Sequence, residues 1–239
     1  MFTTLAALPE QPSYDVIVAG SGAAGLAAAV FAAIEGRSVL VIERTEQVGG
    51  TSALSAATTW IPNSLHAEKV ATGDSLEKAA RFLDGVVGNH SSARLREAFL
   101  RAGPQAIATL EQRTGVHFRP YATHPDYESD VEGSTLRGRA LEPIPFDGRR
   151  LGADLHRIRP PIPEFTLFGG MMIDRTDIGH LLKLRTSWVS FKHAAAILGR
   201  YGLDRLSGRR GTRLVMGNAL IGSLLLTLKQ HGGTVLLNA

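Results

Sequence analysis

The stretch VIVAGSGAAGLAAA, residues 16–29, joins a short β-branched run to a glycine-rich turn and an alanine-rich segment. Residues 14–19 have the composition of a buried strand, and residues 23–35 that of a helix, which Gly36 ends. A second buried strand is predicted over residues 38–43. Strand, helix and strand in such close succession indicate a parallel pair with a crossover helix, so the predicted fold class is α/β.

The turn GSGAAG places Gly20, Gly22 and Gly25 in the G-x-G-x-x-G spacing of a dinucleotide-binding loop. In such a loop the first glycine allows the tight turn, the second lets a diphosphate approach the backbone, and the third lets the helix pack against the strand. The amide groups at the helix start, including those of Ala23 and Ala24, favour negative charge. This spacing alone is weak evidence, but a predicted strand precedes it and a predicted helix follows it.

Glu43 ends the second predicted strand, about 20 residues after the turn, where a carboxylate can accept hydrogen bonds from an adenosine ribose. It would repel a 2′-phosphate, which argues against NADP. The neighbouring Arg44 weakens that argument, because an arginine can pair with phosphate. The alternative is a solvated glutamate at a strand end. These residues do not distinguish NAD from FAD.

The loop GGTSALSAATTWIP, residues 49–62, favours a flavin. Its amides and hydroxyls could donate to phosphate or ribityl oxygens, and Ala53, Ala56 and Ala57 would leave room for a flat ring system. The alternative is a helix of small residues that packs tightly against the sheet. The candidate cofactor-binding residues are Gly20, Gly22, Ala23, Ala24, Gly25, Glu43, Arg44, Gly49, Gly50, Thr51, Ser52 and Ser55.

Helical patterns dominate the rest of the chain. Asp74 and Glu77 resemble a capping box, Asn218 is expected to cap the last helix, and Met171 and Met172 are expected to pack in a core. Residues 120–163 are predicted to form a loop with short strands. Helices are predicted from residue 74 and over residues 92–102, 104–114, 177–184, 188–206 and 218–231, and a strand over 234–237. The chain stops directly after that strand, which favours a truncated chain over a complete small domain with an edge strand.

Composition excludes several classes of function. The 239 residues contain no cysteine, which removes disulfides, thiolate metal sites and cysteine nucleophiles. The net charge is +4 with mixed signs, so no nucleic-acid partner is expected. Metal, NTPase and hydrolase motifs are missing, and so are a secretory signal and a long apolar run, so we expect a cytoplasmic protein without a transmembrane segment. Arg205, Arg209, Arg210 and Arg213 form a basic cluster, either a solvated loop or an anion or partner site.

Together, VIVAGSGAAGLAAA and VIERTEQVGGTSALSAATTWIP closely resemble the FAD-dependent oxidoreductases of the fumarate reductase and succinate dehydrogenase flavoprotein superfamily. GGTSALS with Trp60 and Pro62 is most similar to the 3-ketosteroid Δ1-dehydrogenase branch. HPDY at 124–127, GRALEPIPFDGRRLG at 138–152 and the segment from FGGMM to LVMGNAL also resemble that branch.

The resemblance implies non-covalent FAD, because residues 49–62 contain no histidine of the kind that attaches flavin in the succinate dehydrogenase branch. It also implies a catalytic candidate. Ketosteroid dehydrogenases commonly carry two tyrosines after Pro-Asp, one of which assists proton abstraction. Tyr127 matches the first, and Glu128 replaces the second. A structural loop tyrosine is the alternative for Tyr127.

The implied architecture is the N-terminal part of a Rossmann-like FAD-binding domain, with a largely helical insertion, incomplete at its C-terminus and without its substrate or capping domain. We expect a βαβ core over residues 14–65, a helical and loop region over 66–210, and a returning helix and strand over 211–239. The implied activity is dehydrogenation of a CH–CH bond next to a carbonyl, or the reverse reduction, on an apolar and possibly steroid substrate.

The chain alone is expected to be inactive. The alternatives are a catalytically inactive truncated flavin-binding fragment, a partner-binding module and an NAD-linked dehydrogenase.

Overall fold

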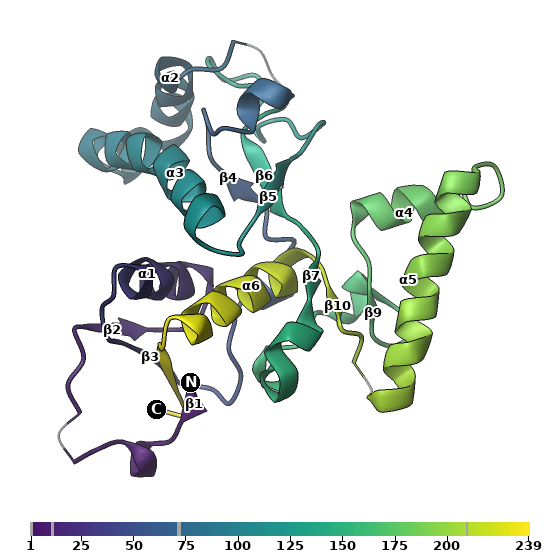
Figure 1. The fold of residues 1–239 in the computed structure, drawn as a ribbon. Coiled ribbons are helices and arrows are strands. Elements are labelled where there is room, and N and C mark those ends of the chain that lie inside the picture. Colours follow the sequence, from purple (N-terminus) through teal and green to yellow (C-terminus); the bar gives the residue numbers. More distant parts are fainter. Residues whose placement is uncertain (1, 11, 71–72, 209) are drawn as a thin grey trace. The chain divides into compact units, whose positions relative to one another are not determined.

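The computed structural model describes residues 2–10, 12–70, 73–208 and 210–239 (Figure 1). They form two compact units. The first, called the nucleotide unit below, contains the chain up to Ala57 together with Ile144–Ala239. The second, called the insertion unit, is Thr58–Pro143. The described residues from 144 to 210, which we had placed in the helical and loop region, group with the βαβ core.

A four-stranded sheet in the order β1-β11-β3-β2 forms the centre of the nucleotide unit, and each neighbouring pair is parallel. Its strands are β1 (Phe2–Thr3), β2 (Val16–Ala19), β3 (Val39–Glu43) and β11 (Thr234–Leu237). The predicted parallel pair is confirmed. Strand β1, which the sequence analysis did not predict, pairs with β11 on the side away from β3. The carboxyl ends of β2, β3 and β11 therefore share one edge.

Two helices pack against each other beside this sheet, α1 (Ala23–Ile34) and α6 (Met216–Gln230) (Figure 1). Helix α1 also contacts β2 and β3. Nearly all of α6 is buried, which suits its apolar sequence. Asn218 does not cap α6, contrary to the prediction, because the helix begins two residues earlier at Met216. The Asn218 side chain instead donates to the Ala53 carbonyl over 2.7 Å.

The rest of the nucleotide unit consists of a helical hairpin and short strand pairs. The helices are α4 (Arg175–Leu182) and α5 (Trp188–Ser207), and the strands are β7 (Phe146–Asp147), β8 (Thr166–Leu167), β9 (Met171–Met172) and β10 (Arg213–Leu214). Asp174 and Asp177 form a capping box at the start of α4. Arg213 binds the fully buried Asp177 carboxylate over 2.8 Å, which ties α4 to β10. Met171 and Met172 are buried, as predicted.

The insertion unit packs two helices with an antiparallel sheet in the order β4-β6-β5. Its elements are α2 (Leu76–Val87), α3 (Ala93–Arg113), β4 (Thr59–Trp60), β5 (Phe118–Pro120) and β6 (Ala140–Pro143). The predicted break at Pro104 is absent, since α3 runs through it. The buried positions Leu100, Gly103, Ile107 and Leu110 continue one apolar face past the proline, and this packing outweighs the lost hydrogen bond.

The N-terminal cap of α2 also differs from the prediction. Ser75 caps the helix by accepting the Lys78 amide over 3.1 Å, while Asp74 pairs with Arg139. None of the helices in the described ranges is both long and apolar enough to cross a bilayer.

Candidate functional site

A cleft of ≈ 440 Å³ opens at the carboxyl edge of the parallel sheet. Gly20 follows β2, Glu43 ends β3 and Ala239 follows β11, and all three line it. In open parallel sheets, ligands bind at this edge, where successive loops leave a crevice. The βαβ order of the first residues therefore brings the glycine loop and the carboxylate together as predicted.

The glycine loop leaves its backbone open toward this cleft. Gly20 has φ +94°, a left-handed value that suits glycine, and its amide donates to the Ile42 carbonyl over 2.8 Å. At the start of α1, the Ala23 amide donates to Ser52 Oγ over 3.1 Å. The amides of Gly22 and Ala24 have no hydrogen-bond acceptor among the residues that the structure describes. A helix N-terminus with unbonded amides favours a phosphate.

The glycines of this loop have different reasons for lacking a side chain. A Cβ on Gly25 would lie 2.0 Å from the Gly20 carbonyl oxygen, so the contact between α1 and the loop requires glycine there. A Cβ on Gly22 would meet only Ser52 Oγ, at an ordinary 3.6 Å. Among the residues that the structure describes, no contact therefore demands glycine at position 22, and the open backbone there fits a dinucleotide diphosphate.

The Glu43 carboxylate is almost fully buried and accepts four hydrogen bonds. Oε2 accepts the amide and hydroxyl of Ser21 over 3.1 and 2.6 Å, and Oε1 accepts the amide and hydroxyl of Thr45 over 3.0 Å each. Glu43 thus fastens the glycine loop to the end of β3. The Thr45 hydroxyl has one proton, which it can give either to Oε1 or to the Gln47 carbonyl, 2.7 Å away. When it donates to Gln47, a lone pair on Oε1 is left for a ligand hydroxyl.

Burial raises the pKa of Glu43, but the hydrogen bonds from Ser21 and Thr45 outweigh burial, and the pKa lies below its ordinary value of 4.5. A carboxyl whose pKa falls on folding stabilises the fold above its unfolded pKa. That contribution is lost as the pH falls through the folded pKa.

We expect Glu43→Gln to lower the free energy of unfolding at pH 7 by about 1–3 kcal/mol, because an amide nitrogen cannot accept from the donors of Ser21 or Thr45. The deficit should shrink as the pH falls below 4.5, because the carboxylate of the unfolded chain takes up its proton there, and the folded carboxylate takes one up only at a still lower pH. Urea unfolding at a series of pH values measures both. Glu46→Gln, at a neighbouring exposed glutamate, is the matched control. A deficit of the same size at all pH values would contradict the assignment.

The loop after Gly49 serves two purposes. Gly50 and Thr51 line the cleft, whereas Gly49 and Ala53 are buried behind it. A Cβ on Gly49 would lie 2.8 Å from the Ala53 Cβ and 3.3 Å from Ile221 of α6. Ala53 is itself buried, in a short helical turn that packs against α6, and this burial supports the packing alternative at this alanine. The Ser55 hydroxyl donates to the Ser52 carbonyl over 2.9 Å.

The structure brings half of the candidate residues to the cleft. The candidates that line it are Gly20, Gly22, Glu43, Arg44, Gly50 and Thr51. The six others support these from α1 or from the loop behind. The residues that sequence reasoning missed are Ala19, Ser21, Ile42, Thr45, Arg159 and Ala239. Most of these are sequence neighbours of candidates or lie at strand ends, where the topology alone could have indicated them. Arg159 had no such signal.

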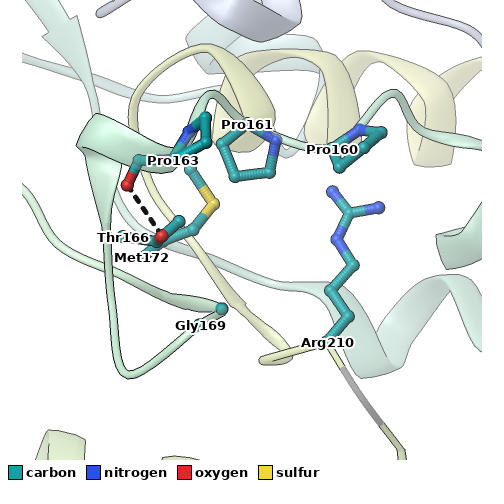
Figure 2. A pocket seen from close by; sticks show the side chains of 8 residues that line it. Pro160, Pro161, Pro163, Thr166, Gly169, Met172 and Arg210 are labelled. Carbon is teal, nitrogen blue, oxygen red and sulfur yellow. Dashed lines mark hydrogen bonds between the residues drawn. The ribbon is translucent and has the colours of Figure 1, made fainter.

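A second cavity of the nucleotide unit, ≈ 340 Å³, lies among the prolines of residues 160–163, Thr166, Met172 and Arg210 (Figure 2). The Arg210 guanidinium donates to the carbonyls of Leu155 and Ile158 over 3.0 and 2.8 Å and to the Asn218 side chain. Burial lowers the pKa of Arg210 to about 10. Its hydrogen bonds stabilise the chain around α6.

The basic cluster is therefore not a shared surface patch. Arg210 binds backbone carbonyls, Arg213 pairs with Asp177, and Arg205 is exposed on α5. Arg209 lies outside the described residues. Two members of the cluster thus have structural partners of their own. Neither of the two predicted roles, a solvated loop or an anion or partner site, included such partners.

Tyr127 lies in the insertion unit, in an apolar cavity of ≈ 370 Å³. Its side chain is 90% exposed, and the ring of His124 lies 5.8 Å away. The preceding Asp126 is buried and accepts the Trp60 indole N–H over 2.6 Å. The phenol is thus presented at the surface of a firmly held loop, and Trp60 and Phe82 form part of the apolar wall.

Comparison with known proteins supports the assignment of the cleft as a cofactor site. The FAD binding domain family matches residues 15–239. The chain is 32% identical to 3-oxosteroid 1-dehydrogenase of Mycolicibacterium smegmatis over 94% of this chain and 39% of that protein. It is 36% identical to 4-oxocyclohex-2-ene-1-carboxylate 5-dehydrogenase of Sinomonas cyclohexanicum over 87% of this chain and 35% of that protein.

A solved structure of the same group aligns along nearly the whole chain. It is the crystal structure of 3-ketosteroid delta1-dehydrogenase from Sterolibacterium denitrificans in complex with 1,4-androstadiene-3,17-dione. The TM-score is 0.84 with 31% identity, over 94% of this chain and 40% of that one. The chain thus spans about two fifths of the length of these relatives. The family model matches residues 15–239, and the glycine cradle fits a dinucleotide. The chain therefore belongs to the FAD-binding domain family, and its cofactor is FAD.

Proposed function

We propose that this chain holds FAD non-covalently in the cleft at the carboxyl edge of its parallel sheet. The observation that carries the proposal is the cradle at Gly22, where the Gly22 and Ala24 amides lack acceptors in the described part of the chain and no protein contact explains the missing Cβ. These amides, together with Gly50 and Thr51, would hold the diphosphate. Glu43 Oε1 would accept from the adenosine ribose when the Thr45 hydroxyl donates to Gln47.

The proposed activity is the dehydrogenation of a CH–CH bond next to a ring carbonyl. The support is that relatives over most of this chain are named as dehydrogenases of cyclic oxo compounds, a 3-oxosteroid in one case and a 4-oxocyclohexene carboxylate in another. We place the substrate in the same class, an apolar cyclic ketone such as a 3-ketosteroid or an oxocyclohexane carboxylate.

In this reaction the substrate loses a proton from the carbon beside the carbonyl and a hydride from the next carbon, and a carbon–carbon double bond forms between them. FAD, when bound, supplies the two-electron acceptor for the hydride. We propose that the exposed phenol of Tyr127 assists the removal of the proton. The apolar walls of the cavity around it, including Trp60 and Phe82, suit a hydrocarbon ring.

The binding part is tested by titration of the purified chain with FAD. We expect a yellow complex with quenched flavin fluorescence. A folded chain that shows no saturable FAD binding would overturn the proposal.

The catalytic part is tested in the full product of the gene, loaded with FAD, with a 3-ketosteroid or an oxocyclohexane carboxylate and a dye as electron acceptor. We expect Tyr127→Phe to lower kcat by ~10²- to 10⁴-fold with unchanged FAD affinity, because it removes the phenolic oxygen. Tyr14→Phe, in the nucleotide unit, is the control and should turn over normally. Normal turnover by Tyr127→Phe would show that Tyr127 is a structural residue, and FAD binding without turnover of either ketone would favour a silent binding module.

A further inference from the structure

Arg159 reaches the cofactor cleft through a contact that is remote in sequence. Ile158 pairs with Val48 in an isolated parallel bridge. The Val48 amide donates to the Arg157 carbonyl over 2.8 Å, and the Arg159 amide donates to the Val48 carbonyl over 2.9 Å. Val48 and Ile158 are both fully buried. This bridge fixes the backbone of residue 159 beside the loop that carries the paired glycines, and Arg159 lines the cleft together with Gly20, Gly22 and Gly50.

The guanidinium of Arg159 has no partner in the described ranges of the chain. Its Nε is fully buried without an acceptor, and neither Nη atom makes a hydrogen bond or an ion pair with a described residue. The Nε atoms of Arg200 and Arg210 are also buried without an acceptor, but Nη atoms of both side chains make hydrogen bonds. Arg139 binds two aspartates, and Arg213 binds Asp177. A half-buried guanidinium with unmet donors is costly unless a ligand supplies acceptors.

The charged side chains that line the cleft indicate which group of the ligand supplies these acceptors. Glu43, a possible counter-ion, already accepts donors from Ser21 and Thr45. The charged side chains that line the cleft are two arginines, Arg44 and Arg159, against one carboxylate, Glu43, and they lie beside open backbone amides. The diphosphate is the charged group of FAD, and a guanidinium matches phosphate oxygens with two parallel N–H donors.

We propose that Arg159 is a further FAD-binding residue, which binds the diphosphate from the segment paired with Val48. This inference rests on the proposed binding of FAD in the cleft. It assigns a role to a residue that lies more than a hundred positions after the glycine loop and outside any nucleotide-binding motif.

The test compares FAD dissociation constants of the wild-type chain, Arg159→Gln, Arg159→Lys and Arg37→Gln, by quenching of flavin fluorescence. Arg37 is an exposed arginine of the same unit just before β3, and it does not line the cleft, so its variant removes the same charge elsewhere. We expect Arg159→Gln to raise the Kd by ~10- to 100-fold. Arg159→Lys should lose less, and Arg37→Gln should stay within about twofold of wild type.

The salt dependence of FAD binding distinguishes the loss of a charge contact from a change in the shape of the cleft. The loss in Arg159→Gln should be larger at about 0.05 M than at about 0.5 M salt, because screening weakens the wild-type contact. Thermal unfolding without FAD should show that all variants are folded. A wild-type Kd in Arg159→Gln would overturn the inference, and so would equal, salt-independent losses in Arg159→Gln and Arg159→Lys. A folded wild-type chain that does not bind FAD would instead overturn the proposed function itself.

Discussion

Replacing Gly25 by alanine is expected to abolish FAD binding and to destabilise the nucleotide unit by about 3 kcal/mol or more. The added Cβ would lie 2.0 Å from the Gly20 carbonyl oxygen, 3.0 Å from its carbonyl carbon and 3.3 Å from Val18 Cγ1. The first two atoms belong to the backbone of the glycine loop, which the Gly20 amide ties to Ile42. The clash can be relieved only by moving α1 away from β2, and that movement breaks the cradle.

The control for this prediction is Gly202→Ala. Gly202 is also a helical glycine, but it lies on the exposed side of α5, and beyond its own stretch of helix no described residue comes within 4 Å of the added Cβ. Alanine there should stabilise the chain by up to ~1 kcal/mol through helix propensity. Urea unfolding with and without FAD measures both variants. If Gly25→Ala unfolds at the wild-type urea concentration and still binds FAD, the close contact between α1 and the loop does not exist in solution.

The contrast between Gly25 and the loop after Gly49 shows what could be predicted from the sequence. The βαβ unit is local, so its strands, helix and glycine spacing lie within one short window, and the structure confirms the parallel pair and the role of Gly25. The small residues at 49 and 53 invited a ligand explanation. Their actual neighbour is α6, which lies more than 150 residues further along the chain, and no local pattern reveals that contact.

Contacts between distant parts of the chain also explain why Arg159 was not predicted and why Asn218 was assigned the wrong role. Arg159 reaches the cleft through one bridge to Val48, and Asn218 bonds the Ala53 carbonyl from inside a helix. Periodicity predicts which face of an element is buried, but it does not predict which distant element covers that face. The prediction of helix caps was wrong for a related reason. Asp74 has the composition of a cap, but a buried arginine 65 residues away takes its carboxylate.

That arginine, Arg139, is the centre of a buried network in the insertion unit. Its side chain is 1% exposed, and those of its partners Asp74 and Asp126 are 2% exposed. Nε and Nη2 bind Asp74, with a shortest distance of 2.7 Å, and Nη1 binds Asp126 over 2.8 Å. Asp126 also accepts the Trp60 indole, so the guanidinium fixes the loop that presents Tyr127.

Arg139→Leu is expected to destabilise the insertion unit by about 3–5 kcal/mol, because it leaves two buried carboxylates without their counter-ion. Converting both aspartates to asparagine in the same chain should recover part of this loss, since the uncompensated charges are then gone. Fluorescence of Trp60 in a Trp188→Phe background follows the unfolding of this unit. Arg137→Gln, at an exposed arginine two residues earlier, should unfold like wild type. If Arg139→Leu unfolds at the same urea concentration as Arg137→Gln, the network is not what holds the Tyr127 loop.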